Sequence, residues 1–226
     1  MWKAMVDELA QQDEREPGSL RVARSVVRRK NGGRAQAATG DLRNVILEVA
    51  AALFHREPIE SLNLDRLADQ TGLGTRRIYR IFGSRKAFLQ AYADLLCDRE
   101  RAQWREAGHR SGEDPVQHLL ELFIDVAVGL ASDACRPRQP HVPAVQFADE
   151  EHPVRLSRIK LAREFRTLLM RLAVAANAVD AEALADTLMM LWENATSNFK
   201  SDSDARRVAQ RLPTLVDHII KSYVML

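Results

Sequence analysis

The sequence contains few of the residues that interrupt regular secondary structure. Only 10 glycines and 8 prolines occur among its 226 residues. Outside the termini, no alternation of apolar and polar residues bounded by turn dipeptides predicts a strand. No stretch approaches the roughly 18–20 apolar residues that span a bilayer, and the N-terminus lacks the apolar core of a signal peptide. The apolar content of 46% is normal for a globular protein. From these features together we expect an all-α protein that is soluble and cytoplasmic.

Signatures of enzymes and metal sites are also missing. We find no Gly-rich phosphate loop, no GxSxG elbow and no HExxH motif. The two cysteines, Cys97 and Cys135, form no CxxC pair; they are most simply buried or partly buried thiols, with a redox pair as the alternative. None of the six histidines has a short metal-ligand spacing, although His141 and His152 could meet across a proline-rich segment. We therefore predict no enzymatic activity, no cofactor and no metal ion.

Residues 62–92 are the most informative stretch, because two short helices and a turn follow one another there without a break. Leu64, Leu67 and Ala68 share one face of the first helix. Gly72 is suited to the left-handed conformation that ends a helix, and Leu73 is expected to fill the space between the two helices. The second helix is expected to begin near Thr75. This order predicts a helix-turn-helix.

Positive charge is concentrated in the second helix and just after it. From Thr71 to Tyr92 there is no acidic residue but there are five basic ones, Arg76, Arg77, Arg80, Arg85 and Lys86. Such segregation favours a polyanionic partner. The alternative is a solvated basic face on an ordinary helical bundle.

Individual residues of this segment predict distinct roles in DNA binding. Ile78 and Phe82 are expected to pack inward, while the hydroxyl of Tyr79 is placed to reach a phosphate. The two arginines that open the helix, Arg76 and Arg77, are the candidate base readers, because an arginine fork pairs with the two major-groove acceptors of guanine. Ser84 is the expected N-cap of the next helix, whose first N–H groups would face a phosphate together with Arg85 and Lys86.

At these residues the chain resembles the TetR family of bacterial transcriptional regulators. The resemblance runs from Arg43 to about Leu89, and it is carried by Ile46, Ala50-Ala51, Leu53-Phe54, Leu67-Ala68, Gly72-Leu73, Ile78-Tyr79, Phe82, Ser84-Arg85 and Phe88-Leu89. Arg76-Arg77 stand where glycine and threonine are common in the family, so the operator sequence of a relative cannot be transferred. The resemblance implies a three-helix head with a helix-turn-helix, followed by a C-terminal helical domain for ligand binding and dimerisation.

These observations divide the chain into three parts. Residues 1–40 are expected to be a basic, flexible extension, in which Arg28, Arg29 and Lys30 form a possible minor-groove arm; the alternative is a merely soluble tail. Residues 41–89 are the expected DNA-binding domain, with Asp41 as an N-cap, and 90–226 are the expected regulatory and dimerisation domain. The predicted DNA-binding residues are Arg43, Thr75, Arg76, Arg77, Tyr79, Arg80, Ser84, Arg85 and Lys86.

Helix signals continue through the C-terminal part. A long helix over 84–107 is expected to end near Gly108, and Asp114-Pro115 opens a helix that runs to about Ala131. Four prolines between 132 and 153 predict a loop, with a short helical turn around 145–148. Further helices are expected over 153–177, 181–199 with Asp180 as its cap, and 202–223. Pro213 should kink the last of these unless neighbouring groups compensate.

The resemblance also implies a second subunit and an effector. In the family, the last two helices form a four-helix interface with their copies; the corresponding apolar stripes here contain Leu184, Leu188, Leu191, Trp192, Leu212, Leu215, Val216 and Ile219, and the alternative is that they form the intramolecular core. The candidate ligand-binding residues are Trp104, His118, Phe123, Phe147, Phe165, Met170 and Met189, which would be plain core in the alternative reading.

We accordingly expect a homodimeric, nucleoid-associated repressor. It would bind a palindromic operator in double-stranded DNA and leave it when a small-molecule effector binds. The alternative is a DNA-bound protein whose C-terminal domain contacts another protein and binds no small molecule. Neither reading involves a membrane.

Overall fold

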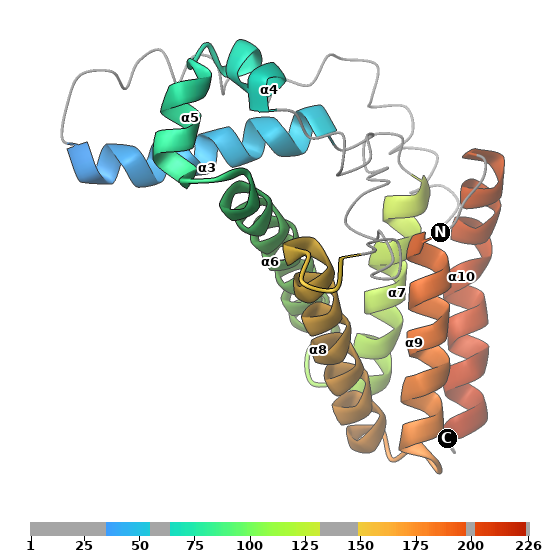
Figure 1. Ribbon diagram of the computed structural model, residues 1–226. Helices are drawn as coiled ribbons and strands as arrows, with labels where there is room; N and C mark the ends of the chain where they lie inside the picture. The colour runs from blue at the N-terminus through green and yellow to red at the C-terminus, as the bar shows by residue number, and fades with distance from the viewer. Residues whose placement is uncertain (1–34, 55–63, 132–148, 198–201, 225–226) are drawn as a thin grey trace.

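The computed structural model describes residues 35–54, 64–131, 149–197 and 202–224. Within these ranges all regular structure is α-helical, which confirms the predicted fold class (Figure 1). The helices are α3 (Ala35–Phe54), α4 (Leu64–Thr71), α5 (Thr75–Phe82), α6 (Arg85–Ser111), α7 (Pro115–Ala131), α8 (Pro153–Ala175), α9 (Ala181–Ser197) and α10 (Asp202–Tyr223).

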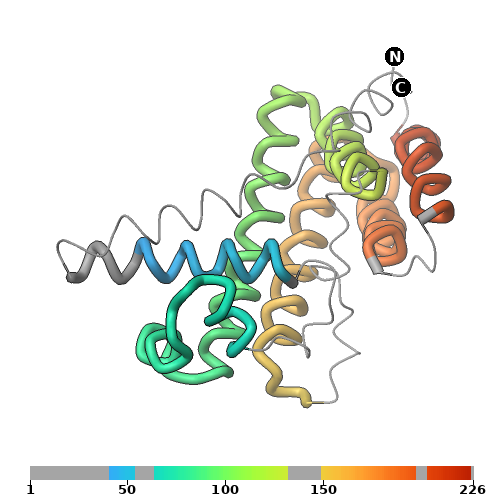
Figure 2. Tube along the Cα trace, turned by 90° about the horizontal axis from the view of Figure 1, so that it is seen from above, coloured from blue at the N-terminus to red at the C-terminus, as the bar shows by residue number. Residues whose placement is uncertain are grey.

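The helices form a small head and a larger bundle, joined by the long α6. The helices α3, α4 and α5 gather at one end of α6. The helices α7 and α8 pack along α6, and α9 and α10 pack on α7 and α8 (Figure 1). Seen from above, α3 lies across the end of α6 that belongs to the head (Figure 2). None of the helices in the described ranges has the length and apolar content needed to cross a bilayer.

Each part has its own apolar core. In the head, buried residues of α3, α4 and α5, such as Ile46, Leu67 and Ile78, pack on Phe88 and Tyr92 from the first turns of α6. The bundle core is formed by residues of α7 to α10 together with Ala107 near the end of α6. Val154, in the first turn of α8, belongs to the head core. The head is therefore connected to the bundle through α8 as well as through α6.

Two aspartates cap the first turns of helices, as the sequence predicts. The carboxylate of Asp114 accepts hydrogen bonds from the backbone N–H groups of Val116 and Gln117, at 2.9 and 3.1 Å. The carboxylate of Asp180 accepts one from the N–H of Ala183 at 2.9 Å. These bonds satisfy donors that the first turn of a helix leaves without a partner. The helix α10 continues as one element through Pro213.

Two helix boundaries differ from the expectation. The helix α6 continues past Gly108 to Ser111 and ends at Gly112, which has a φ of 62°. Gly108 lies against an imidazole instead, because a Cβ at this position would stand 2.9 Å from Cε1 of His118. The second difference is the start of α3. This helix begins at Ala35, so Asp41 lies inside it and is not its N-cap. The expected helical turn around 145–148 lies outside the described residues.

A buried ion pair joins α6 to α8. Nη1 of Arg158 donates to Oε1 of Glu100 at 2.6 Å, and the two side chains are 11% and 8% exposed. The guanidinium of Arg158 also lies over the ring of Trp192 from α9, 5.6 Å from its centroid. Burial raises the pKa of Glu100, and the charge of Arg158 opposes that rise. One point between the two cores is therefore fixed by a charge pair rather than by apolar packing.

Other polar contacts follow the same seam between α6 and α8. The amide of Gln90 donates to the hydroxyl of Ser157 at 2.9 Å, and Arg101 donates to Glu164 at 2.7 Å. Cys97 is buried beside Ser157, as the sequence predicted for a thiol, and burial raises its pKa to about 11. At neutral pH this thiol is protonated, which disfavours oxidation. Cys135 lies outside the described residues.

Replacing Glu100 with alanine is expected to lower the free energy of unfolding by about 3–5 kcal/mol, because the buried charge of Arg158 is left without this carboxylate. The double replacement Glu100→Leu with Arg158→Met is expected to cost much less, since neither charge then remains in the interior. Urea unfolding at one protein concentration measures both changes. Asp217→Ala is the control: it breaks the ion pair between Asp217 and the exposed Lys221 and should cost less than about 1 kcal/mol. A double variant as unstable as the single one would contradict this account.

Candidate nucleic-acid interface

A tight turn joins α4 to α5. Gly72 has a φ of 66°, a backbone conformation that residues other than glycine adopt only at a cost in free energy. The N–H of Leu73 donates to the carbonyl of Ala68 at 3.1 Å, and the Leu73 side chain is buried. The hydroxyl of Thr71 donates to the carbonyl of Leu67 at 2.8 Å. Together these bonds close the end of α4 and fix the direction in which the chain enters α5, as the sequence predicted.

The start of α5 is held by a neighbouring helix rather than by its own cap. Gly74 occupies the N-cap position in an extended conformation and provides no side-chain hydrogen bond. Instead, the hydroxyl of Thr75 donates to the carboxylate of Asp65 in α4 at 2.9 Å. Sequence reasoning missed Asp65, because its partner lies 10 residues further along the chain and no periodic pattern connects them.

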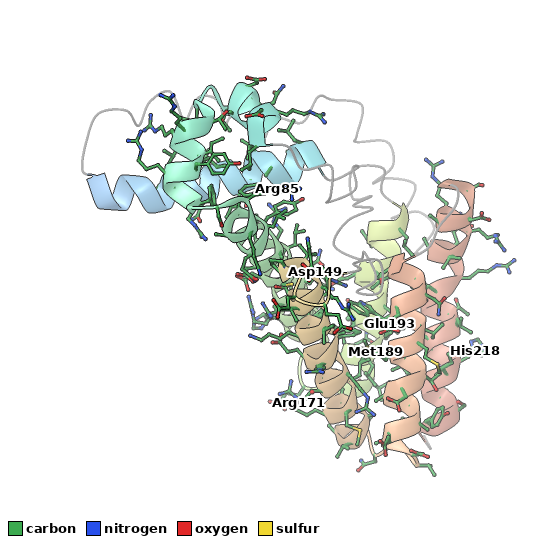
Figure 3. All side chains as sticks on the ribbon, viewed as in Figure 1. Arg85, Asp149, Arg171, Met189, Glu193 and His218 are labelled. Carbon is green, nitrogen blue, oxygen red and sulfur yellow. The ribbon has the colours of Figure 1, made fainter. Side chains whose placement is uncertain are left out.

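The helix α5 has one apolar edge and an outward polar face. Ile78 and Phe82 are buried in the head core, as predicted. The side chains of Arg76, Arg77 and Arg80 are exposed, and Tyr79 is 42% exposed. Nitrogen-tipped side chains extend from this helix away from the bundle (Figure 3). The sequence of α5, TRRIYRIF, contains no carboxylate that would neutralise this face.

The start of α6 adds two cations and a capped helix end next to α5. Ser84 is the N-cap, and its Oγ accepts a hydrogen bond from the N–H of Ala87 at 3.1 Å. This confirms the predicted cap. Arg85, labelled in Figure 3, and Lys86 are exposed in the first turn. The first turn of a helix has unsatisfied N–H groups and a partial positive charge, so it attracts anions.

Arg43 extends the same surface from α3. Its guanidinium lies 5.3 Å from the centroid of the Phe82 ring, and the residue is exposed. A cation over an aromatic face is attracted by the ring quadrupole, so Phe82 holds Arg43 beside the end of α5. The structure thus brings all nine predicted DNA-binding residues to the head. The arm residues Arg28, Arg29 and Lys30 lie outside the described residues.

The predicted ligand-binding residues within the described ranges lie in or against the bundle core. The ring of Phe165 lies 4.8 Å from Trp104 on one side and 4.8 Å from Trp192 on the other. Nε2 of His118 is 3.3 Å from the carbonyl oxygen of Trp104. Phe123 is fully buried in this core, whereas Met170 and Met189 are partly buried against it. Phe147 lies outside the described residues.

The predicted dimer-interface residues separate into two groups. Five of them are buried in the chain's own core, so they have no surface to offer a second subunit in this conformation: Leu184, Leu188, Trp192, Leu212 and Val216. This burial agrees with the alternative of an intramolecular core, and a part for these five residues in a dimer interface stays a prediction. Leu191 and Ile219 are partly buried, and Leu215 is 47% exposed. The structure adds Met190, which is 59% exposed and was not predicted.

Comparison with known proteins identifies the head. Residues 46–92 match the family model described as bacterial regulatory proteins, tetR family. This confirms the resemblance, at the residues from which it was inferred. No functionally curated protein matches the chain in sequence.

Solved structures of this family have the same fold. A TetR-family transcriptional regulator from Streptomyces coelicolor superposes with a TM-score of 0.70 at 20% identity, over 82% of this chain and 96% of that one. A TetR-type regulator from Streptomyces avermitilis gives 0.65 at 20% identity, over 80% and 97%. A further regulator, from a Rhodococcus species, gives 0.54 at 18% identity, over 80% and 99%. At these identities the likeness concerns the fold, and together with the family model it supports a DNA-binding regulator.

Two glycines of the turn provide a matched pair of substitutions. Gly74→Ser is expected to stabilise the protein by a few tenths of a kcal/mol, about 0.3, because serine caps α5 better than glycine. Gly74 has an extended backbone, and no atom within 4 Å obstructs a Cβ. Gly72→Ser is expected to cost about 1–2 kcal/mol, because φ is positive there. Thermal unfolding of the two variants gives the signs, and a loss of stability in Gly74→Ser would show that the extended glycine has another role.

Proposed function

We propose that this chain, whose residues 46–92 match the tetR-family head, is a homodimeric transcriptional repressor that binds a palindromic operator through α5 and leaves it when a small molecule binds. One observation carries the proposal. The two buried residues of α5 lie on one edge, so its three arginines and Tyr79 all face solvent on the other side. An α-helix with such a face fits the major groove of B-DNA.

Within this face, we assign two kinds of contact. Arg76 and Arg77 lie in the first turn of α5, where the recognition helix of a helix-turn-helix reaches the base edges. Tyr79 and Arg80, with Ser84, Arg85, Lys86 and Arg43 around them, contact phosphates, and Thr75 contacts DNA next to its bond to Asp65. Phosphate contacts fix the position of the head, and base contacts select the sequence.

Two heads are needed to read a full operator. A two-fold dimer places its recognition helices about 34–36 Å apart, one turn of the duplex, so that both reach the same face of the DNA. We assign the second-subunit contact to the outer faces of α9 and α10, where Met190, Leu191, Leu215 and Ile219 retain apolar surface after the core has formed. A two-fold axis through this face buries the same residues on both subunits.

Release of DNA then depends on the two connections between head and bundle. The first half of α6 packs in the head core, and Val154 of α8 packs in the same core. A small molecule that binds among α6, α7 and α8 and displaces α8 along α6 would turn the head relative to the dimer. By linkage, it weakens operator affinity by the ratio of its own affinities for the two head positions. Residues of the bundle core around Phe165 are the proposed binding region.

The test is fluorescence anisotropy of the purified protein on the duplex upstream of its own gene and on a shuffled duplex of equal length, at about 0.15 M salt. Specific regulators prefer their site by about a thousandfold or more, and this is the expected result. Equal and steeply salt-dependent binding to both duplexes would remove the sequence-specific part of the proposal. Absence of binding to either, and to a random duplex library, would remove the DNA-binding function itself.

Two substitutions separate base readers from phosphate contacts. Arg77→Ala is expected to reduce the preference for the selected site about 5- to 150-fold, the equivalent of 1–3 kcal/mol, because a bidentate base contact is lost. Tyr79→Phe is expected to weaken binding to the selected and the shuffled duplex by the same factor, because a phosphate carries no sequence information. Arg207→Ala, a change of an exposed arginine on α10 paired with Asp204, is the control. A uniform loss in both head variants would refute the division of roles.

A further inference from the structure

One long face of α8 is left uncovered by the other described helices. The neighbours of α8 are α6, α7 and α9, and the exposed residues follow the helical period along the remaining side. They are Leu156, Lys160, Arg163, Thr167, Arg171 and Val174, which we call the α8 stripe. Their spacings of three and four residues place them on one face of the helix, over a length of about 27 Å. Figure 3 shows Arg171 near the lower end of this helix.

The stripe carries positive charge that no described carboxylate neutralises. The other arginines of α8 are paired: Arg155 with Glu150, Arg158 with Glu100, and Arg166 with Asp186 and Glu182. Glu164, the single acid of the helix, bonds to Arg101. Lys160, Arg163 and Arg171 form no ion pair within the described residues. Apolar side chains flank these cations, since Leu156 and Val174 are 51% and 57% exposed.

The chain contains one segment with the complementary pattern. Residues 1–16, MWKAMVDELAQQDERE, have five carboxylates and two basic side chains. At helical spacing, one face of this segment presents Trp2, Met5, Val6, Leu9, Asp13 and Glu16, so it is apolar in its first half and acidic in its second. As a helix the segment measures about 24 Å, which matches the length of the stripe.

We infer that residues 1–16 dock on the α8 stripe as an amphipathic helix. The acidic end, Asp13 and Glu16, lies beside Lys160 and Arg163, and Trp2 lies toward Val174. Chain connectivity sets this direction. Val154, at the stripe's first end, packs in the head core that α3 also forms, and residue 16 is the end of the segment nearer to α3. The 18 residues between 16 and 35 reach about 60 Å when extended, roughly twice the length of the stripe.

Docking would act on the basic residues that follow the segment. Residues 17–34 contain Arg21, Arg24, Arg28, Arg29, Lys30 and Arg34 and no acid. With residues 1–16 held on α8, one end of this basic stretch is tied to the bundle, which lowers its effective concentration at DNA bound to the head. This consequence rests on the proposed DNA-binding function, whereas the docking itself does not.

Zero-length cross-linking with a carbodiimide tests the docking on the full chain without DNA. The expected product joins Lys160 to Asp13, Glu14 or Glu16, identified by mass spectrometry, and its yield falls with salt. Lys221, an exposed lysine on α10, is the internal control and should not link to residues 1–16. In a mixture of isotope-labelled and unlabelled protein, the expected cross-link joins segments of the same labelling, and a mixed product would overturn docking within one chain.

A charge exchange makes the test specific for the stripe. Arg163→Glu is expected to lower the Lys160 cross-link about three- to tenfold, because one attraction becomes a repulsion, and adding Glu16→Arg should restore it through Asp13 and Glu14. Arg211→Glu, at an exposed position of α10, should change nothing. Circular dichroism verifies folding of each variant. Carboxylates of residues 1–16 that link mainly to Lys30 or Lys221, or a Lys160 product that ignores Arg163→Glu, would overturn the proposal whatever the outcome of the DNA assays.

Discussion

The relative position of the head and the bundle depends on α6, because side chains of this one helix pack in both apolar cores. Phe88 and Tyr92 pack with the head, and Ala107 packs with the bundle. A helix of 27 residues measures about 40 Å, and its backbone hydrogen bonds make it a continuous element over that length. The positions of head and bundle are therefore not independent, because any rotation of α6 moves apolar side chains at both ends. Close-packed cores favour a few discrete arrangements over continuous adjustment.

The seam between α6 and α8 determines which arrangement is adopted. The hydrophobic effect is not directional and does not by itself select one of these arrangements, whereas the bond between Glu100 and Arg158 is directional and buried. A displaced seam would leave both charges in the interior without each other, which is costly. Arg158 also lies over Trp192, so α9 contributes to the same register. The ion pair between Glu100 and Arg158, with Trp192 beside it, thus fixes the positions of α6, α8 and α9 relative to one another.

The sequence predicted local features well and long-range ones poorly. Asp114, Asp180 and Ser84 were identifiable because a cap acts within a few residues. In the candidate interface, the exposure of Arg76 and Arg77 followed from the helical period. By contrast, Gly108 indicates a helix end in sequence but contacts His118, Glu100 resembles a surface acid, and Asp65 bonds across a turn. An apolar stripe on α9 does not say whether it faces its own core or a partner, so the burial of Leu184 and Leu188 in the bundle core could not be deduced from the sequence.

Because of the bond between Thr75 and Asp65, different residues of α5 anchor the helix in the head and present side chains to solvent. The start of α5 is anchored by its first residue to α4, while Gly74 makes no side-chain bond. The next two positions, Arg76 and Arg77, face solvent. Mutations at these two positions therefore leave the bond that anchors the start of α5 intact. With Arg76 and Arg77 as the proposed base readers, such a head can change from one operator to another over evolutionary time by single substitutions, each of which leaves the protein folded.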